Sequence, residues 1–209
     1  MQAVGSIAGS VQNANGTPVA NVAVSVNIRP TSGGSFQPFN TVVTTTSDGT
    51  FSVPRVPNGK FAVCPAAPGT SLLAPCMWGS ELTVTVINGQ TVTMPTVKLQ
   101  PGVDFYVRVN DPHGKLAANL GKTPGASLTL AVRSPNGMVA PIPVTASDAA
   151  GFDYHLSVPS GTDLLFVASS GSFSMADAAG AAISPQAGLS QTINIPAGQS
   201  QYKQTITIN

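Results

Sequence analysis

The chain has 209 residues and a formal net charge of +1, and only 8% of its residues are charged, against roughly 25% in an average soluble protein. Because it contains no run of Lys or Arg, it lacks the phosphate attraction that drives nucleic-acid binding, and nucleic acid is excluded as a partner. The apolar content of 42% is enough for folded domains, and no stretch approaches the ~18 apolar residues that would suggest a membrane span.

Apolar and polar residues alternate through most of the first half, as in half-buried β-strands. Predicted strands cover residues 7–11, 22–28, 41–46, 50–53, 60–63, 82–86 and 92–99, and the Gly- and Ser-rich residues 31–35 form a loop. In the second strand, Val22, Val24, Val26 and Ile28 share the core face. Asp48-Gly49 predicts a hairpin with a type I′ turn, and Asn88-Gly89 predicts that the last two strands pair.

The second half repeats this pattern. Its predicted strands cover residues 103–109, 128–132, 142–146, 152–158, 164–168, 192–195 and 204–208. Residues 169–188 form the longest stretch without a strand pattern and are expected to be a flexible loop. Seven short strands in each half, separated by turn signals, predict β-sandwiches.

Three groups of turn residues recur in the same order in both halves. The offset grows from 100 between Ser47 and Ser147 to 102 between Val56 and Val158. Duplicated domains diverge in this way when insertions collect in surface loops. The sequence therefore predicts tandem domains at residues 1–100 and 101–209, joined by a short link that Pro101 stiffens.

Cys64 and Cys76 bracket a Pro-rich segment. A disulfide between them would close a loop of about a dozen residues and stabilise the fold by roughly 3 kcal/mol. Two free buried thiols are the alternative, whereas two sulfurs without further ligands cannot complete a tetrahedral zinc site. We expect the disulfide, and with it an oxidising, extracytoplasmic location. The N-terminus lacks a secretion signal, so either the signal has been removed or the protein is intracellular.

The first half resembles the carboxypeptidase regulatory-like domains, which are transthyretin-like or Ig-like β-sandwiches often found in exported bacterial proteins. The resemblance covers roughly residues 5–100 and rests on G-S-I-A-G-S-V at residues 5–11, N-G-T-P-V at 15–19, S-D-G-T-F at 47–51 and V-P-N-G-K-F at 56–61. The segment from Cys64 to Trp78 is similar to a variant in uncharacterised exported proteins.

The second half departs from the pattern of this family. Ala149 and Ala150 replace the tight glycine, and Asp163 stands where an aromatic residue follows the P-x-G turn. The resemblance does not imply peptidase activity, because in those enzymes the zinc-bearing catalytic domain is separate and no H-x-x-E motif occurs here.

The polar residues do not form a recognisable catalytic or metal site. His155 shares a strand face with Asp153 and Ser157, but neighbours on that face are ~6.6 Å apart, beyond the reach of a nucleophile-to-base hydrogen bond. His113 lies in a turn, and Asp48 and Asp148 are expected to cap their own turns. We therefore predict no enzyme activity, no metal and no cofactor.

Two features bear on function. Trp78 is a candidate platform for stacking a glycan, with packing over the cysteine loop as the alternative reading. The C-terminal strand is uncharged and strongly β-forming, and it is expected to be an exposed edge available for assembly; it comprises Gln204, Thr205, Ile206, Thr207, Ile208 and Asn209. The alternative is that this strand completes its own sheet.

From these features we predict a non-catalytic, extracellular structural or adhesive protein of the bacterial cell surface. It would self-associate through edge strands or apolar faces and could serve as a filament subunit. A module that binds a glycan or a surface protein is the alternative.

Overall fold

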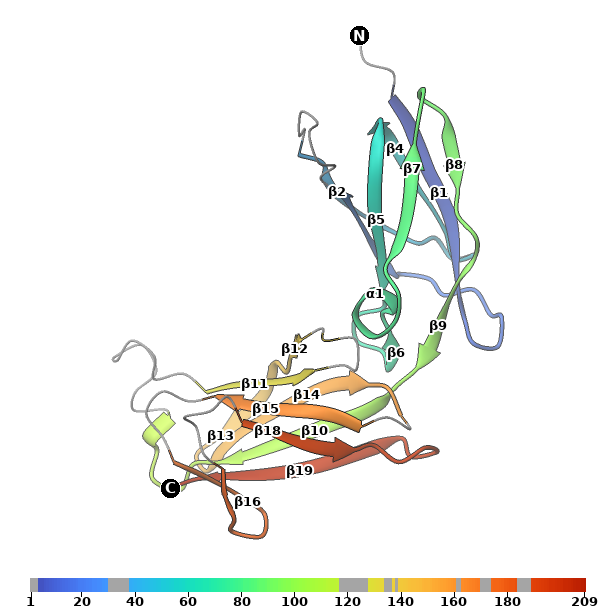
Figure 1. Cartoon of the computed structure of the whole chain (residues 1–209). Coiled ribbons are helices and arrows are strands. Elements are labelled where there is room, and N and C mark those ends of the chain that lie inside the picture. The colour runs from blue at the N-terminus through green and yellow to red at the C-terminus, as the bar shows by residue number, and fades with distance from the viewer. Residues whose placement is uncertain are drawn as a thin grey trace. The chain divides into compact units, whose positions relative to one another are not determined.

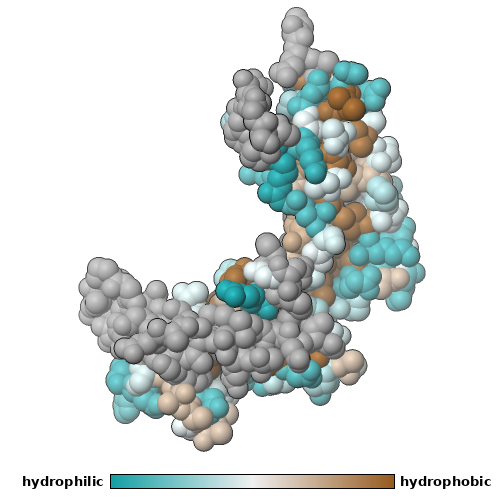
Figure 2. Space-filling view, in the orientation of Figure 1, coloured by the Kyte–Doolittle hydropathy of each residue, from teal (hydrophilic) through white to brown (hydrophobic). Residues whose placement is uncertain are grey.

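A computed structural model describes residues 4–29, 38–116, 128–133, 137, 139–160, 163–169, 174–183 and 189–209. These residues are mostly strands and turns, with little helix, which includes α1 (Pro75–Trp78), so the predicted all-β class is confirmed (Figure 1). The chain divides into two compact units, Met1–Pro101 and Gly102–Asn209. Hydrophilic and hydrophobic residues are interspersed over the visible surface of the first unit (Figure 2).

One sheet of the first unit is built around the N-terminal strand β1. β1 pairs antiparallel with β4 and parallel with β8 and β9, and β6 extends the sheet beyond β9. The register between β1 and β4 shifts between Gly5 and Ser6, where Arg55 of β4, with a φ of 58°, is the extra residue of a bulge. The strands are β1 (Val4–Asn13), β4 (Thr50–Pro57), β6 (Leu72–Leu73), β8 (Thr91–Thr93) and β9 (Val97–Pro101).

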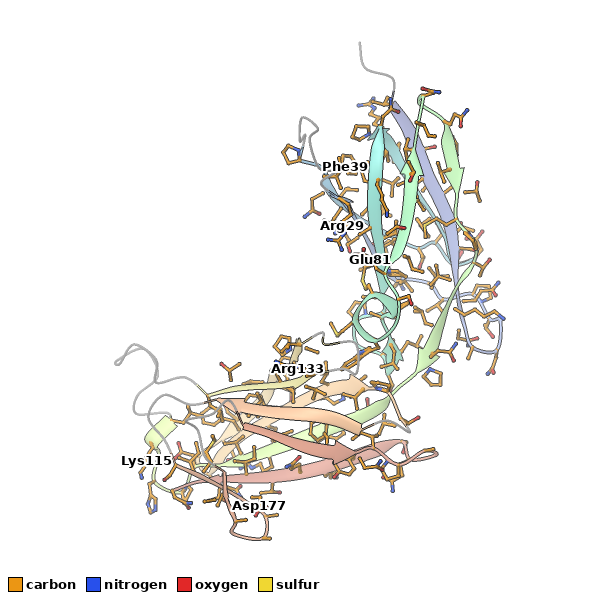
Figure 3. All side chains as sticks on the ribbon, in the orientation of Figure 1. Arg29, Phe39, Glu81, Lys115, Arg133 and Asp177 are labelled. Carbon is orange, nitrogen blue, oxygen red and sulfur yellow. A yellow bond between two sulfur atoms is a disulfide. The ribbon has the colours of Figure 1, made fainter. Side chains whose placement is uncertain are left out.

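The other sheet of the first unit is antiparallel, in the order β3-β2-β5-β7. An ion pair between Arg29, at the end of β2, and Glu81, just before β7, spans the intervening β5 (Figure 3). The strands are β2 (Ala23–Arg29), β3 (Asn40–Thr44), β5 (Gly59–Ala66) and β7 (Leu82–Val86).

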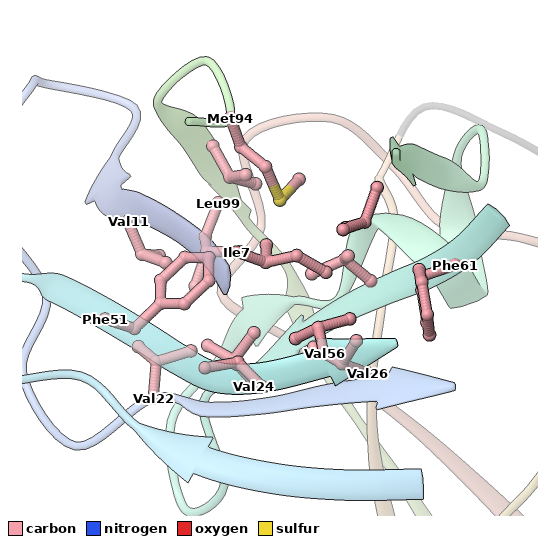
Figure 4. Packing of buried hydrophobic residues seen from close by; sticks show 14 of the residues in the cluster. Ile7, Val11, Val22, Val24, Val26, Phe51, Val56, Phe61, Met94 and Leu99 are labelled. Atoms are coloured by element: carbon pink, nitrogen blue, oxygen red, sulfur yellow. The ribbon is translucent and has the colours of Figure 1, made fainter. Parts of the chain in front are cut away.

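The core of the first unit consists of aliphatic and aromatic side chains from both sheets (Figure 4). Val22, Val24 and Val26 are fully buried and Ile28 packs at the margin, so the predicted core face of the second strand is confirmed. Phe61 is also fully buried and meets Phe39 edge to face, with ring centroids 5.5 Å apart. Because buried and more exposed side chains alternate along these strands, apolar residues recur at every second position of the sequence.

The second unit also contains two sheets. Their orders are β13-β14-β10-β19-β16-β17 and β12-β11-β15-β18. The strands are β10 (Val103–Asn110), β11 (Thr129–Arg133), β12 (Val139–Pro141), β13 (Val144–Asp148), β14 (Gly151–Val158), β15 (Asp163–Ser169), β16 (Met175–Asp177), β17 (Ala182–Ile183), β18 (Leu189–Asn194) and β19 (Gln201–Ile208).

The two units share most of their strand pairings; among the described strands, the β1–β8 pair of the first unit and the β13–β14 pair of the second have no counterpart in the other unit. In each, the first strand pairs antiparallel with the strand that follows the Asp turn and parallel with the last strand: β4-β1-β9 corresponds to β14-β10-β19. The opposite sheets, β3-β2-β5-β7 and β12-β11-β15-β18, correspond strand by strand. The repeated turn residues thus lie at equivalent places in two copies of one fold.

Both predicted hairpins in the first unit are wrong, because the chain changes sheets at each turn. After Asp48-Gly49, β4 pairs with β1, whereas the preceding β3 pairs with β2. Only Thr46 and Thr50 pair locally, and the positive φ lies at Gly49, the fourth residue of the turn, so the turn is not type I′. Asn88 and Gly89 both have positive φ, as a type I′ turn requires, yet β7 pairs with β5 and β8 with β1.

The described part of residues 169–188 is not a loop. Residues 174–183 contain the β16–β17 hairpin, and β16 pairs antiparallel with β19. In the first unit, β6 likewise pairs antiparallel with β9. In each unit, the segment that connects two strands of one sheet, β5 to β7 or β15 to β18, therefore pairs with the last strand of the other sheet. The predicted loop at residues 31–35 lies outside the described residues.

Candidate functional site

The disulfide of the first unit joins β5 to the segment between β5 and β7. Cys64 in β5 and Cys76 in α1 form the expected disulfide, with Cα atoms 5.5 Å apart. α1 places Trp78 at its last position, where the side chain is half-buried. A role for Trp78 in binding stays a prediction.

The C-terminal strand is an interior strand. β19 pairs with β10 from Gln201 to Thr207 and, on its other side, with β16 from Ile206 to Ile208. The backbone N–H of Asn209 also donates to the carbonyl of Ser174 at 2.9 Å. The expectation of an exposed edge is therefore wrong for residues 206–209, because the segment between β15 and β18 folds back and pairs with them; the pairing with β16 does not extend to Gln204 and Thr205.

A polar cluster occupies the outer face of β10 and β14. His155 Nε2 lies 3.0 Å from Asp104 Oδ1, and the Ser157 hydroxyl donates to the same oxygen at 3.2 Å. The His155 ring stacks on Tyr106, with centroids 4.5 Å apart and planes 19° apart. Since the Ser157 proton is directed to Asp104, this serine and histidine are not arranged as nucleophile and base.

An arginine clamp lies next to this cluster. Arg108 Nη2 donates to both carboxylate oxygens of Asp148, at 2.7 and 2.9 Å, and Arg108 Nη1 lies 3.2 Å from Asp153. The hydrogen bond from Arg108 lowers the pKa of Asp148, and the bond to Asp148 raises the pKa of Arg108. Asp148 Oδ1 also accepts the backbone N–H of Ala150, which is the predicted turn cap.

A groove of about 520 Å³ crosses this face of the second unit. Its lining comes from β10, β13, β14 and β19, and the polar residues of the lining are Tyr106, Arg108, Thr145, Asp153, Tyr154, Gln201, Lys203, Gln204 and Thr205. Sequence reasoning did not find this site, since its residues come from strands up to about a hundred positions apart. The only local signal was the alternation in β10, which leaves Asp104, Tyr106 and Arg108 opposite the buried valines.

Within the described ranges, no three His, Cys, Asp or Glu side chains gather as metal ligands. Over the same ranges, no helix has the length and apolar character needed to cross a bilayer.

No family model matches the sequence, and no curated protein matches it either. Among solved structures, the chain is similar to the Bacillus anthracis TIE protein (12% identity, TM-score 0.38, 99% of this chain and 34% of that one) and to a streptococcal ancillary pilin (11%, 0.44, 97% and 62%). It is also similar to the minor pilin GBS52 of Streptococcus agalactiae (15% identity, TM-score 0.37, 98% of this chain and 95% of that one). The chain thus spans less than two thirds of the first two proteins.

Proposed function

We propose that this chain is a non-catalytic structural or adhesive protein of the bacterial cell surface whose copies associate through sheet edges. In this proposal the first unit is a carboxypeptidase regulatory-like domain and the second a divergent copy. The Cys64–Cys76 disulfide supports an oxidising compartment. The low charge of the chain supports close association, because little electrostatic repulsion separates the copies.

The observation that carries the proposal is the composition of β3 and β7, the two edge strands of the β3-β2-β5-β7 sheet. β3 and β7 contain only Asn, Thr, Val and Leu, without the Lys or Pro that usually protects an edge. The side chain of Val42 in β3 is 60% exposed. Pairing β3 of one copy with β7 of the next would extend the sheet head to tail, and such heterologous contacts generate open filaments.

In this proposal the copies associate through β3 and β7, and not through the C-terminal strand β19. Placing Lys at Thr205 and Thr207, or deleting residues 204–209, would disturb a strand that pairs with β10 up to Thr207 and with β16 at residues 206–208, and so destabilise the second unit. Those changes cannot separate assembly from folding. Substitutions on β3 and β7 can, because the outward side chains of Val42 and Thr83 are exposed.

The test is light scattering and negative-stain microscopy of the purified protein at rising concentration. We expect concentration-dependent particles that Val42→Lys and Thr83→Lys each suppress, because charge on an edge opposes strand addition. Ser80→Lys adds the same charge at an exposed position outside the strands and is the matched control. A wild-type protein that stays monomeric throughout, or assembly that both edge variants leave intact, refutes the proposal.

A further inference from the structure

The groove on the second unit has the character of a small-molecule site. Its volume of about 520 Å³ falls within the roughly 300–1,000 Å³ of typical ligand pockets. The strand register places Lys203 beside Tyr106, and Asp153 beside Arg108, across adjacent strands. Aromatic, basic and acidic groups from three strands therefore lie on one continuous face.

The floor of this groove is held in place by interactions within the protein. Tyr106 is stacked on His155, and His155 Nε2 lies 3.0 Å from Asp104 Oδ1, which holds the imidazole ring in place. Arg108 is fixed by its contacts with Asp148 and Asp153. A ligand would meet side chains that are already ordered, which reduces the entropy lost on binding.

The charges in the groove compensate one another. Among the lining residues, Arg108 and Lys203 are positive and Asp153 is negative, and Asp148, which is not part of the lining, forms an ion pair with Arg108. An anion would meet the carboxylate of Asp153 and a guanidinium that is already paired, and a cation would meet the ammonium group of Lys203. This balance favours a neutral ligand that can both donate and accept hydrogen bonds.

We propose that the groove binds a short neutral oligosaccharide. A sugar hydroxyl donates to a carboxylate such as Asp153 and accepts from an ammonium such as Lys203. The apolar face of a sugar ring can lie against Tyr106, whose ring lines the groove. The Thr145 and Thr205 hydroxyls at either side suit further hydroxyl contacts. This site is independent of the edge contacts proposed above.

The test is amide NMR of the labelled protein titrated with cellotriose, maltotriose and tri-N-acetylchitotriose at millimolar concentrations. We expect at least one of them to shift signals from β10, β14 and β19, and expect the charged trisaccharide trigalacturonate to bind more weakly. Tyr106→Ala and Lys203→Ala should each weaken binding by about tenfold or more. Lys98→Ala, an exposed lysine on the corresponding strand β9, is the matched control and should bind like wild type.

Three results would overturn the site. They are an absence of shifts with all three neutral sugars, shifts confined to the region of Trp78, and tighter binding of trigalacturonate than of any neutral sugar. Because Lys203 is exposed, its variant should keep the wild-type spectrum, so a loss of binding there is not a loss of folding. Val42→Lys should bind the sugar normally, which separates this test from that of assembly.

Discussion

Asp111 in the second unit occupies the position that Val11 occupies in the first. The backbone N–H of Val11 donates to the carbonyl of Gly49 at 2.8 Å, and that of Asp111 donates to the carbonyl of Ala150 at the same distance. Both side chains are buried, with 3% of Asp111 exposed. The carboxylate is satisfied locally, since its two oxygens accept the backbone N–H groups of Lys115 and Leu116 at 2.8 Å each.

Replacing Asp111 with the valine of the first unit should destabilise the second unit. Asp111→Val leaves two backbone N–H groups without their acceptor, and the one at Leu116 is buried. We expect a loss of about 1–3 kcal/mol in the free energy of unfolding, measured by urea denaturation. Asp177→Val is the control, because Asp177 also accepts two backbone N–H groups, but in an exposed turn. Equal losses in the two variants would contradict the prediction.

Breaking the disulfide should weaken the first unit alone. Cys64 and Cys76 are 12 residues apart, so opening this loop should cost about 3 kcal/mol in the chain-entropy account. Denaturation of Cys64→Ser/Cys76→Ser against wild type measures the loss, and the transition of the second unit should not move. Intact-mass analysis after alkylation without reductant provides a separate check: two alkylated cysteines in protein from its native compartment would show that the bond is absent.

Gly49 should not tolerate alanine. Its φ is +74°, and a Cβ there would lie 2.5 Å from the Val11 carbonyl oxygen. We expect Gly49→Ala to cost about 1–3 kcal/mol from backbone strain, with a further cost from the clash. Gly198 has a similar φ of +81° but no atom within 4 Å of a new Cβ, so Gly198→Ala isolates the strain. If urea denaturation finds equal losses, the clash with Val11 contributes nothing.

The Arg108–Asp148 pair should make stability depend on pH. Because the pKa of Asp148 is lowered in the folded protein, the folded state holds fewer protons than the unfolded state, and stability rises with pH. Wild type should exceed Asp148→Asn in stability at neutral pH. The difference should be fully present above the ordinary carboxyl pKa of about 3.9 and disappear as the pH falls through the lower folded value. Urea denaturation across this range measures it, and a constant difference would contradict the linkage.

His155 should support no hydrolysis. Its Nε2 contacts Asp104, and the Ser157 proton is directed to the same carboxylate, so no activated nucleophile results. Ester, peptide and glycoside substrates should show no turnover that depends on this residue. Turnover by wild type that His155→Ala abolishes would prove this reading of the cluster wrong.

The sequence alone predicted the features of this protein that depend only on residues close together in the chain. Alternation along residues 22–28 identified the core face of β2, because successive side chains on a strand point to opposite sides. Asn88-Gly89 was found as a turn, because both residues must accept positive φ. The repeated Asp turns indicated the duplication that the shared strand topology displays.

Strand partners were decided only by the tertiary structure. The turns at Gly49 and Gly89 carry the chain from one sheet to the other, and a turn sequence does not specify which sheet its flanking strands join. β19 resembles an exposed edge in sequence, yet β16 pairs with its last three residues, Ile206–Ile208. Asp104 and His155 are 51 residues apart and meet only because β10 and β14 pair in one register. Contacts across a sheet depend on that register, which packing of the whole unit sets.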